Sequence, residues 1–217
     1  MATVGVFVNF LTSKFSFNFY YSTLNKLFRE YLKKPYEFFL NNNIEVINSD
    51  AISRDVVQPG TNALAKIEER FGAEILTGSK TLNRPRMRSI IFKDEDQKDW
   101  LENLLHPLIR DAISRSIAYA KSDYVVLESP LLLETDQHKL VDRILVVDIS
   151  PKTQLERTLA RDGGSKDTIK SIIDSQLTRS ERLNRADDVI NNEQDIQSVQ
   201  SEFESIHRNY LILARQK

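Results

Sequence analysis

The sequence predicts an α/β domain built on a mainly parallel β-sheet flanked by helices. From Ile44 onward, short runs rich in valine and isoleucine alternate with longer stretches whose apolar residues recur at helical spacing. Each short run also passes directly into polar residues, and substrates of open α/β sheets bind beyond the carboxyl ends of the strands. We therefore expect the functional residues to follow the strand ends.

Four runs are short and β-branched enough to be predicted as strands: residues 44–47, 124–127, 143–149 and 189–190. The polar residues at their ends are the first candidates for ligand contacts, and they are Asn48, Ser49, Asp50, Glu128, Ser129 and Asp148. Position alone makes them candidates.

Composition divides the chain into three predicted parts. Residues 1–43 form an atypical segment with eight of the eleven phenylalanines and only two acidic residues. Residues 44–59 and 122–217 form the predicted core, with a lid at about 151–185. Residues 60–121 lack any strand pattern, so we expect a helical lobe with helices near 61–71, 84–92, 94–105 and 107–121.

Three helices are expected in the last third of the chain. Ser150 can cap a helix that begins at Pro151 and ends at Asp162-Gly163-Gly164. A second helix is expected from about Asp167 to Leu183. The final helix repeats apolar residues at three-four spacing, which suits either a coiled coil or, as its short length favours, packing on the sheet of this chain. These residues are Ile196, Val199, Phe203, Ile206, Tyr210 and Leu213.

Composition also argues against several classes of function. Thirty Lys and Arg balance thirty-one Asp and Glu, so no positive field favours a nucleic-acid partner. The chain has no cysteine and only three histidines, and we expect no disulfide and no dedicated metal site. Polar residues interrupt the apolar start of the chain, which argues against a membrane span or secretory signal, with a transit-type peptide left open. We expect a soluble, cytoplasmic monomer.

Asp50 and the arginines of the predicted lid suggest phosphoryl transfer. That reaction needs positive charge around the moving phosphoryl group and one acceptor that orients the attacking hydroxyl. Arg157, Arg161 and Arg179 could supply the charge, although Arg157 and Arg161 could equally form a solvated face paired with Glu156 or Asp162. Asp50 could equally be a helix N-cap.

Two further residues each have more than one possible role. His106 could be catalytic, or a packed or capping histidine of the helical lobe, and Glu134 could be a lid contact or a surface acid. One expected part of a phosphate site is missing, because none of the six glycines precedes a lysine and no GxxxxGK[ST] loop exists in the sequence.

From Ile44 onward the sequence resembles the bacterial dephospho-CoA kinase family. The resemblance rests on blocks in the same order: Ile47–Arg54, Val56–Gly60, Phe71-Gly72, Leu82–Arg84, Ile91-Phe92, Leu105–Ile109, Pro130–Glu134, Val146–Asp148, Gln154, Arg157, Arg161-Asp162, Gln176, Arg179, Arg182 and Ala186–Asn192. The family pattern departs at Asn48 and Asn83, where acids are usual, and in residues 1–43, which replace the P-loop unit.

The resemblance implies a P-loop kinase-like fold with a helical CoA-binding lobe and a helical lid. It implies ATP and Mg²⁺ as cofactors, dephospho-CoA as the acceptor, and phosphorylation of its ribose 3′-hydroxyl in coenzyme A biosynthesis. Asp50 would orient or deprotonate that hydroxyl. Arg84, His106 and Glu134 would contact the substrate, and Arg157, Arg161 and Arg179 the ATP phosphates. Without the loop, two alternatives stay open: a silent protein that binds CoA or dephospho-CoA, and an aromatic segment that binds a partner or a membrane surface.

The change from an aromatic, asparagine-rich segment to the family pattern is abrupt, as in out-of-frame reading of AT-rich coding DNA. We expect another frame over codons 1–35 to encode a glycine-rich loop with a lysine. Sequencing the genomic DNA checks this, and the absence of such a loop from both other frames would reject the hypothesis.

Overall fold

The structure is a computed structural model that describes residues 2–7, 37–162, 165–174 and 177–216. Among these residues, contacts separate two compact units. The sheet unit comprises the described residues up to 47 and from 119 onward, and the helical unit comprises residues 48–118. Most of the atypical segment 1–43, and with it the partner-binding interpretation, lies outside the described residues.

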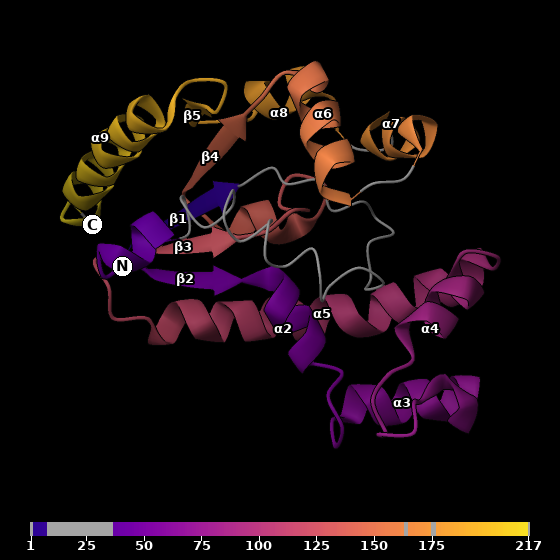
Figure 1. The fold of residues 1–217 in the computed structure, drawn as a ribbon. Helices are drawn as coiled ribbons and strands as arrows, with labels where there is room; N and C mark the ends of the chain where they lie inside the picture. The colour runs from indigo at the N-terminus through magenta and orange to yellow at the C-terminus, as the bar shows by residue number, and fades with distance from the viewer. Residues whose placement is uncertain (1, 8–36, 163–164, 175–176, 217) are drawn as a thin grey trace. The chain divides into compact units, whose positions relative to one another are not determined.

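A five-stranded sheet, ordered β2-β3-β1-β4-β5, forms the sheet unit (Figure 1). Its strands are β1 (Ala2–Phe7), β2 (Glu45–Asn48), β3 (Tyr124–Glu128), β4 (Arg143–Asp148) and β5 (Asp188–Asn191). β1 pairs in parallel with both β3 and β4, placing Val4 opposite Val126 and Arg143, and β4 pairs in parallel with β5. Parallel pairing brings the carboxyl ends of these strands to one edge.

The predicted mainly parallel α/β fold is confirmed, and so are its four strands. The central strand β1 was not predicted, because the aromatic composition of residues 1–43 set the whole segment apart. Its run from Thr3 to Phe7 contains β-branched valines that could have identified it. The atypical segment therefore begins with the strand on which both halves of the sheet pair.

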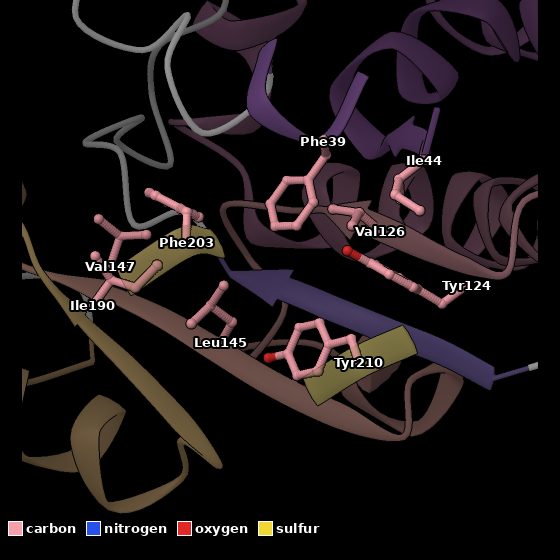
Figure 2. Close-up of a cluster of buried hydrophobic side chains, with 9 residues drawn as sticks. All are labelled: Phe39, Ile44, Tyr124, Val126, Leu145, Val147, Ile190, Phe203 and Tyr210. Atoms are coloured by element: carbon pink, nitrogen blue, oxygen red, sulfur yellow. The ribbon is translucent and has the colours of Figure 1, made fainter. Parts of the chain in front are cut away.

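Both faces of β3 and β4 are buried, as expected for a parallel sheet covered on two sides. Figure 2 shows the side chains that fill one of these faces. They alternate along the strands and meet aromatic rings from helical residues 37–41 and from α9 (Ile196–Ala214). The nine buried residues are Phe39, Ile44, Tyr124, Val126, Leu145, Val147, Ile190, Phe203 and Tyr210.

The final helix α9 packs on the sheet of its own chain, as predicted. Phe203 and Tyr210 are each 1% exposed within the aromatic cluster, and the ring centroids of Phe38 and Phe203 lie 5.7 Å apart. The predicted contact of Leu213 is wrong, because that side chain is 37% exposed while Leu211 and Ala214 pack against the cluster. The contact stripe of a real helix shifts from a strict seam, since 3.6 residues make one turn.

The helical unit contains α2 (Ser49–Asp55), α3 (Asn62–Phe71), the 3₁₀ turn η1 (Ala73–Ile75), α4 (Arg84–Ile91) and α5 (Glu95–Tyr119), the last of which ends at the unit boundary. They enclose a second apolar core around Ile67 and Ile75, both 0% exposed. The predictions of helices near 61–71 and 84–92 are confirmed. Among the described helices, none combines the length and apolar character that a membrane crossing requires.

The two helices predicted at 94–105 and 107–121 are one helix, so the predicted break is wrong. α5 runs through Pro107 without interruption. Proline removes one backbone donor and disfavours a helix interior, but buried Leu101 and Ile113 anchor α5 on either side of it. Tertiary packing here outweighs the local preference.

The described residues between β4 and β5 form three helices, where two were predicted. α6 (Pro151–Asp162) begins as predicted, with the Ser150 hydroxyl accepting from the Thr153 amide at 3.2 Å. The helix predicted from Asp167 to Leu183 is instead α7 (Lys166–Asp174) and α8 (Arg179–Asn184). Thr178 and Glu181 form a capping box that starts α8 afresh. The 3₁₀ turn η2 (Asp136–Leu140) precedes β4.

Replacing the ring at Phe203 should show that α9 is held by the aromatic cluster. We expect Phe203→Ala to lower the free energy of unfolding by about 3–5 kcal/mol, because it leaves a cavity in a fully buried cluster. Leu213→Ala, on the exposed side of the same helix, should change it by about 0.5 kcal/mol or less. Urea unfolding measures both, and equal effects would contradict the packing described.

Candidate functional site

Asp50 lies in the first turn of α2, directly after β2. The alternative in which Asp50 is the N-cap is wrong. Asn48 is the N-cap, since its side chain accepts a hydrogen bond from the Ala51 amide at 2.8 Å. The Asp50 carboxyl is therefore not used for capping, and the side chain is half-buried.

Burial and one arginine set the charge state of Asp50. Burial raises the pKa of the Asp50 carboxyl, and Arg54, one turn further along α2, acts in the opposite direction. Burial lowers the pKa of Arg84, and repulsion from Arg54 adds to this. The helical unit thus gathers one partly buried acid and two interacting arginines, a combination suited to a ligand that carries both hydroxyl and anionic groups.

A pocket of about 250 Å³ opens beside Arg84 in the helical unit. Asn83 caps α4 by accepting from the Arg86 amide at 3.2 Å, and Arg84 is the first residue of that helix. On the other side, the Thr77 and Thr81 hydroxyls lie 2.7 Å apart across a tight turn. The lining residues are Val57, Gln58, Thr77, Thr81, Leu82, Asn83, Arg84 and Pro85.

His106 does not join this group. It is exposed on α5 and is not among the residues that line the pocket. The alternative of a packed histidine is therefore wrong, and a substrate contact by His106 stays a prediction.

In the sheet unit, Asp148 and Arg179 form an ion pair that the sequence did not predict. Asp148 ends β4, and Arg179 is the first residue of α8. The Nε of Arg179 lies 2.8 Å and 3.1 Å from the two carboxylate oxygens, and a terminal guanidinium nitrogen contacts Oδ2 as well. Hydrogen bonding to Asp148 raises the pKa of Arg179. Hydrogen bonds from two guanidinium nitrogens to one carboxylate fix the direction of the guanidinium group.

Glu134 and Arg182 connect the loop after β3 to the start of α8. Glu134 accepts from the Leu177 amide at 3.3 Å, and Arg182 donates to the Leu177 carbonyl. Burial lowers the pKa of Arg182, whereas Asp148 and Glu134 favour its charged form. Glu134 is thus half-buried in a contact with the predicted lid rather than a surface acid. Arg182 was not a site candidate, although its place one turn after Arg179 could have indicated it.

Arg157 projects from α6 and donates to the Asn192 carbonyl at 3.2 Å, just beyond the end of β5. This contact ties α6 to the loop that leads into α9. Arg161 belongs to the last turn of α6, but its side chain lies outside the described part of the chain, as does Gln176.

The ion pair between Asp148 and Arg179 should contribute measurably to stability. A double-mutant cycle with Asp148→Asn and Arg179→Gln should give a coupling of about 0.5–1 kcal/mol, because Arg179 is partly exposed and solvent screens the pair. Urea unfolding in low and high salt measures the coupling, which should fall in high salt. Arg215→Gln, at the exposed end of α9, should show no coupling with Asp148→Asn. A coupling of zero for the pair would contradict the geometry.

Known proteins are similar to this chain over the region that contains these residues. The family model described as dephospho-CoA kinase matches residues 36–198. A dephospho-CoA kinase of Idiomarina loihiensis is 44% identical over 168 residues, covering 77% of this chain and 83% of that protein. One of Shewanella oneidensis is 43% identical over 176 residues, covering 81% and 86%.

Solved structures agree on the fold. The crystal structure of TT1252 from Thermus thermophilus has a TM-score of 0.71 at 19% identity, covering 96% of this chain and 97% of that one. Dephospho-CoA kinase from Campylobacter jejuni has a TM-score of 0.67 at 22% identity, covering 95% of each chain. The fold is α/β and P-loop kinase-like. With the family model matching three quarters of its length, this chain belongs to the dephospho-CoA kinase family.

Proposed function

We propose that this protein phosphorylates the ribose 3′-hydroxyl of dephospho-CoA with ATP, a step in coenzyme A biosynthesis. One observation carries the proposal. The matched region, 36–198, includes a half-buried acid, Asp50, at the start of the helix after β2. An acid in this position can orient a hydroxyl and accept its proton.

Asp50 would act on the acceptor hydroxyl. As the hydroxyl oxygen bonds to the terminal phosphorus of ATP, the bond from that phosphorus to the bridging oxygen of the leaving ADP breaks, and the hydroxyl proton passes to the Asp50 carboxylate. Burial raises the pKa of Asp50, which makes its carboxylate a stronger base than an exposed one.

Arg84 would contact the anionic part of dephospho-CoA from the 250 Å³ pocket, because arginine binds phosphate oxygens with paired donors. His106, exposed on α5, and Glu134 are the other proposed substrate contacts. We assign residues 60–121 as the CoA-binding lobe on the same grounds, and 151–185 as the lid.

Arg157, Arg161 and Arg179 are the proposed contacts to the ATP phosphates. Positive charge there would stabilise the charge that spreads over the moving phosphoryl group. The structure describes the side chains of Arg157 and Arg179, each of which already bonds an oxygen at the end of a strand or just beyond it. Arg179 would therefore need to share or exchange its bond with Asp148 when a phosphate binds.

We propose that Mg²⁺ takes part in this reaction only while bound to ATP. Within the described residues there is no group of three or more acidic or histidine side chains that could hold a metal ion. Magnesium in kinases retains water and phosphate oxygens as ligands and needs few protein groups. When bound it would neutralise phosphate charge, and we assign no residue of this chain to it.

The missing glycine-lysine pair predicts weak catalysis. A P-loop supplies backbone donors and a lysine to the phosphates, and removing a single donor of this kind costs about a hundredfold to a thousandfold in rate. A silent protein that binds CoA or dephospho-CoA is thus a second candidate, favoured by a pocket that lies wholly in the helical unit.

A coupled ADP-release assay with dephospho-CoA and Mg-ATP tests the kinase proposal. The unaltered chain is compared with a chimera in which the N-terminal unit of the Idiomarina loihiensis relative replaces residues 1–35. We expect the chimera to turn over at least roughly a thousandfold faster. Asp50→Asn in the chimera should lower its rate about a hundredfold to ten-thousandfold, because it removes the proposed base.

An inactive chimera would reject the kinase proposal, and an unaltered chain within about tenfold of the chimera would reject weak catalysis. Calorimetry on the unaltered chain, with dephospho-CoA and ATP added separately, decides on the second candidate. That candidate requires binding of dephospho-CoA without ATP, and weaker binding by Arg84→Met than by the matched Arg86→Met.

A further inference from the structure

Asn48 lies where β2 ends and α2 begins, and its side chain bonds to the first turn of α2. It is the last residue of β2 and the N-cap of α2, with an extended backbone at φ −96° and ψ 112°. Its Oδ1 accepts from the Ala51 amide at 2.8 Å. The first amides of any helix lack partners within the helix, so this bond satisfies one of them and fixes where the helix starts.

The Asn48 bond encloses Asp50. Asp50 lies between the two residues that the bond joins, and its own carbonyl accepts from the Ser53 hydroxyl at 2.8 Å. The backbone is therefore held on both sides of Asp50. Only the rotation of a short side chain is left to determine where the half-buried carboxyl points.

The cap is neutral, which matters for a neighbouring acid. An asparagine caps a helix as well as an aspartate does, but it adds no charge. The charged group that acts on Asp50 is Arg54 of α2, and Arg84 of α4 in turn acts on Arg54. A carboxylate at position 48 would stand two residues from Asp50 and oppose its ionisation.

We propose that Asn48 is a positioning residue for Asp50: its neutral side chain caps α2, fixes the backbone from which the Asp50 carboxyl projects and adds no like charge beside that carboxyl. The inference rests on the proposed function, in which Asp50 orients the acceptor hydroxyl. The cap and the acid belong to the same unit of the structure.

Three substitutions in the unaltered chain separate the two effects. Asn48→Ser keeps a neutral cap, Asn48→Asp keeps the cap and adds a charge, and Asn48→Ala removes the cap. Carbon-detected NMR titration follows the Asp50 carboxyl, and amide hydrogen exchange follows Ala51. Neither measurement requires catalysis.

We expect Asn48→Ser to leave both measurements close to those of the unaltered chain. Asn48→Asp should keep exchange slow and raise the pKa of Asp50. Asn48→Ala should speed Ala51 exchange on the order of fivefold and shift the pKa of Asp50 toward its ordinary value, because the loosened turn exposes the carboxyl.

Unchanged Ala51 exchange and an unchanged Asp50 pKa in Asn48→Ala would overturn the inference, as would identical Asp50 pKa values in the Ser and Asp variants. The comparison of Ser with Asp decides the question even if the Ala variant fails to fold. Inactivity of the chimera would reject the kinase proposal without altering these results. If the chimera is active, Asn48→Ala should lower its kcat more than it changes its KM for dephospho-CoA, and Asn48→Ser should restore kcat.

Discussion

Burial of the sheet on both faces is the constraint on which the sheet unit depends. β3 and β4 are apolar on both sides, so each face must be covered by helices, and the aromatic cluster around Phe203 and Tyr210 provides that cover on one of them. Because the strands that pair with β1 and β4 run in parallel, their polar ends meet at one edge. This core positions Asp148 and the residues that follow β3 and β5.

The arginines of the two units have different electrostatic surroundings. In the sheet unit, Arg179 of α8 bonds the Asp148 carboxylate at the end of β4, and Arg157 of α6 bonds the Asn192 carbonyl just beyond β5, so both guanidinium groups are already oriented. In the helical unit, Arg54 and Arg84 repel each other, and Arg54 also acts on the half-buried Asp50. Burial favours the neutral form of Arg84 and the neutral form of Asp50. In the sheet unit, an anionic ligand would compete with the bonds that Arg157 and Arg179 already make.

The atypical segment 1–43 contributes both a strand of the sheet and two rings of the aromatic cluster. Its first residues, Ala2–Phe7, form the strand on which both halves of the sheet pair, although the sequence contains no GxxxxGK[ST] loop. The match to the family model begins at residue 36, and Phe38 and Phe39, shortly after it, pack in the aromatic cluster. Strand pairing requires only backbone groups, whereas a phosphate cradle requires particular residues, so β1 can form without the residues of such a loop.

Local sequence was enough to predict the mainly parallel α/β class, four of the strands, the start of α6 and, with Leu213 as an exception, the face of α9 that packs. Those features follow from periodicity, β-branching and capping residues, which act over a few positions. The family relationship also followed from the sequence, because its blocks occur in order.

Tertiary structure decided the rest. It showed that α5 is continuous through Pro107, that a separate helix, α8, begins after Thr178, and that Asn48 rather than Asp50 caps α2. It also paired Arg179 with Asp148 across thirty-one positions of sequence. The continuity of α5 depends on the burial of Leu101 and Ile113, and the pairing of Arg179 depends on a distant partner, and no local pattern of residues records either. The caps at Asn48 and Thr178 are short-range bonds that a local pattern could have indicated.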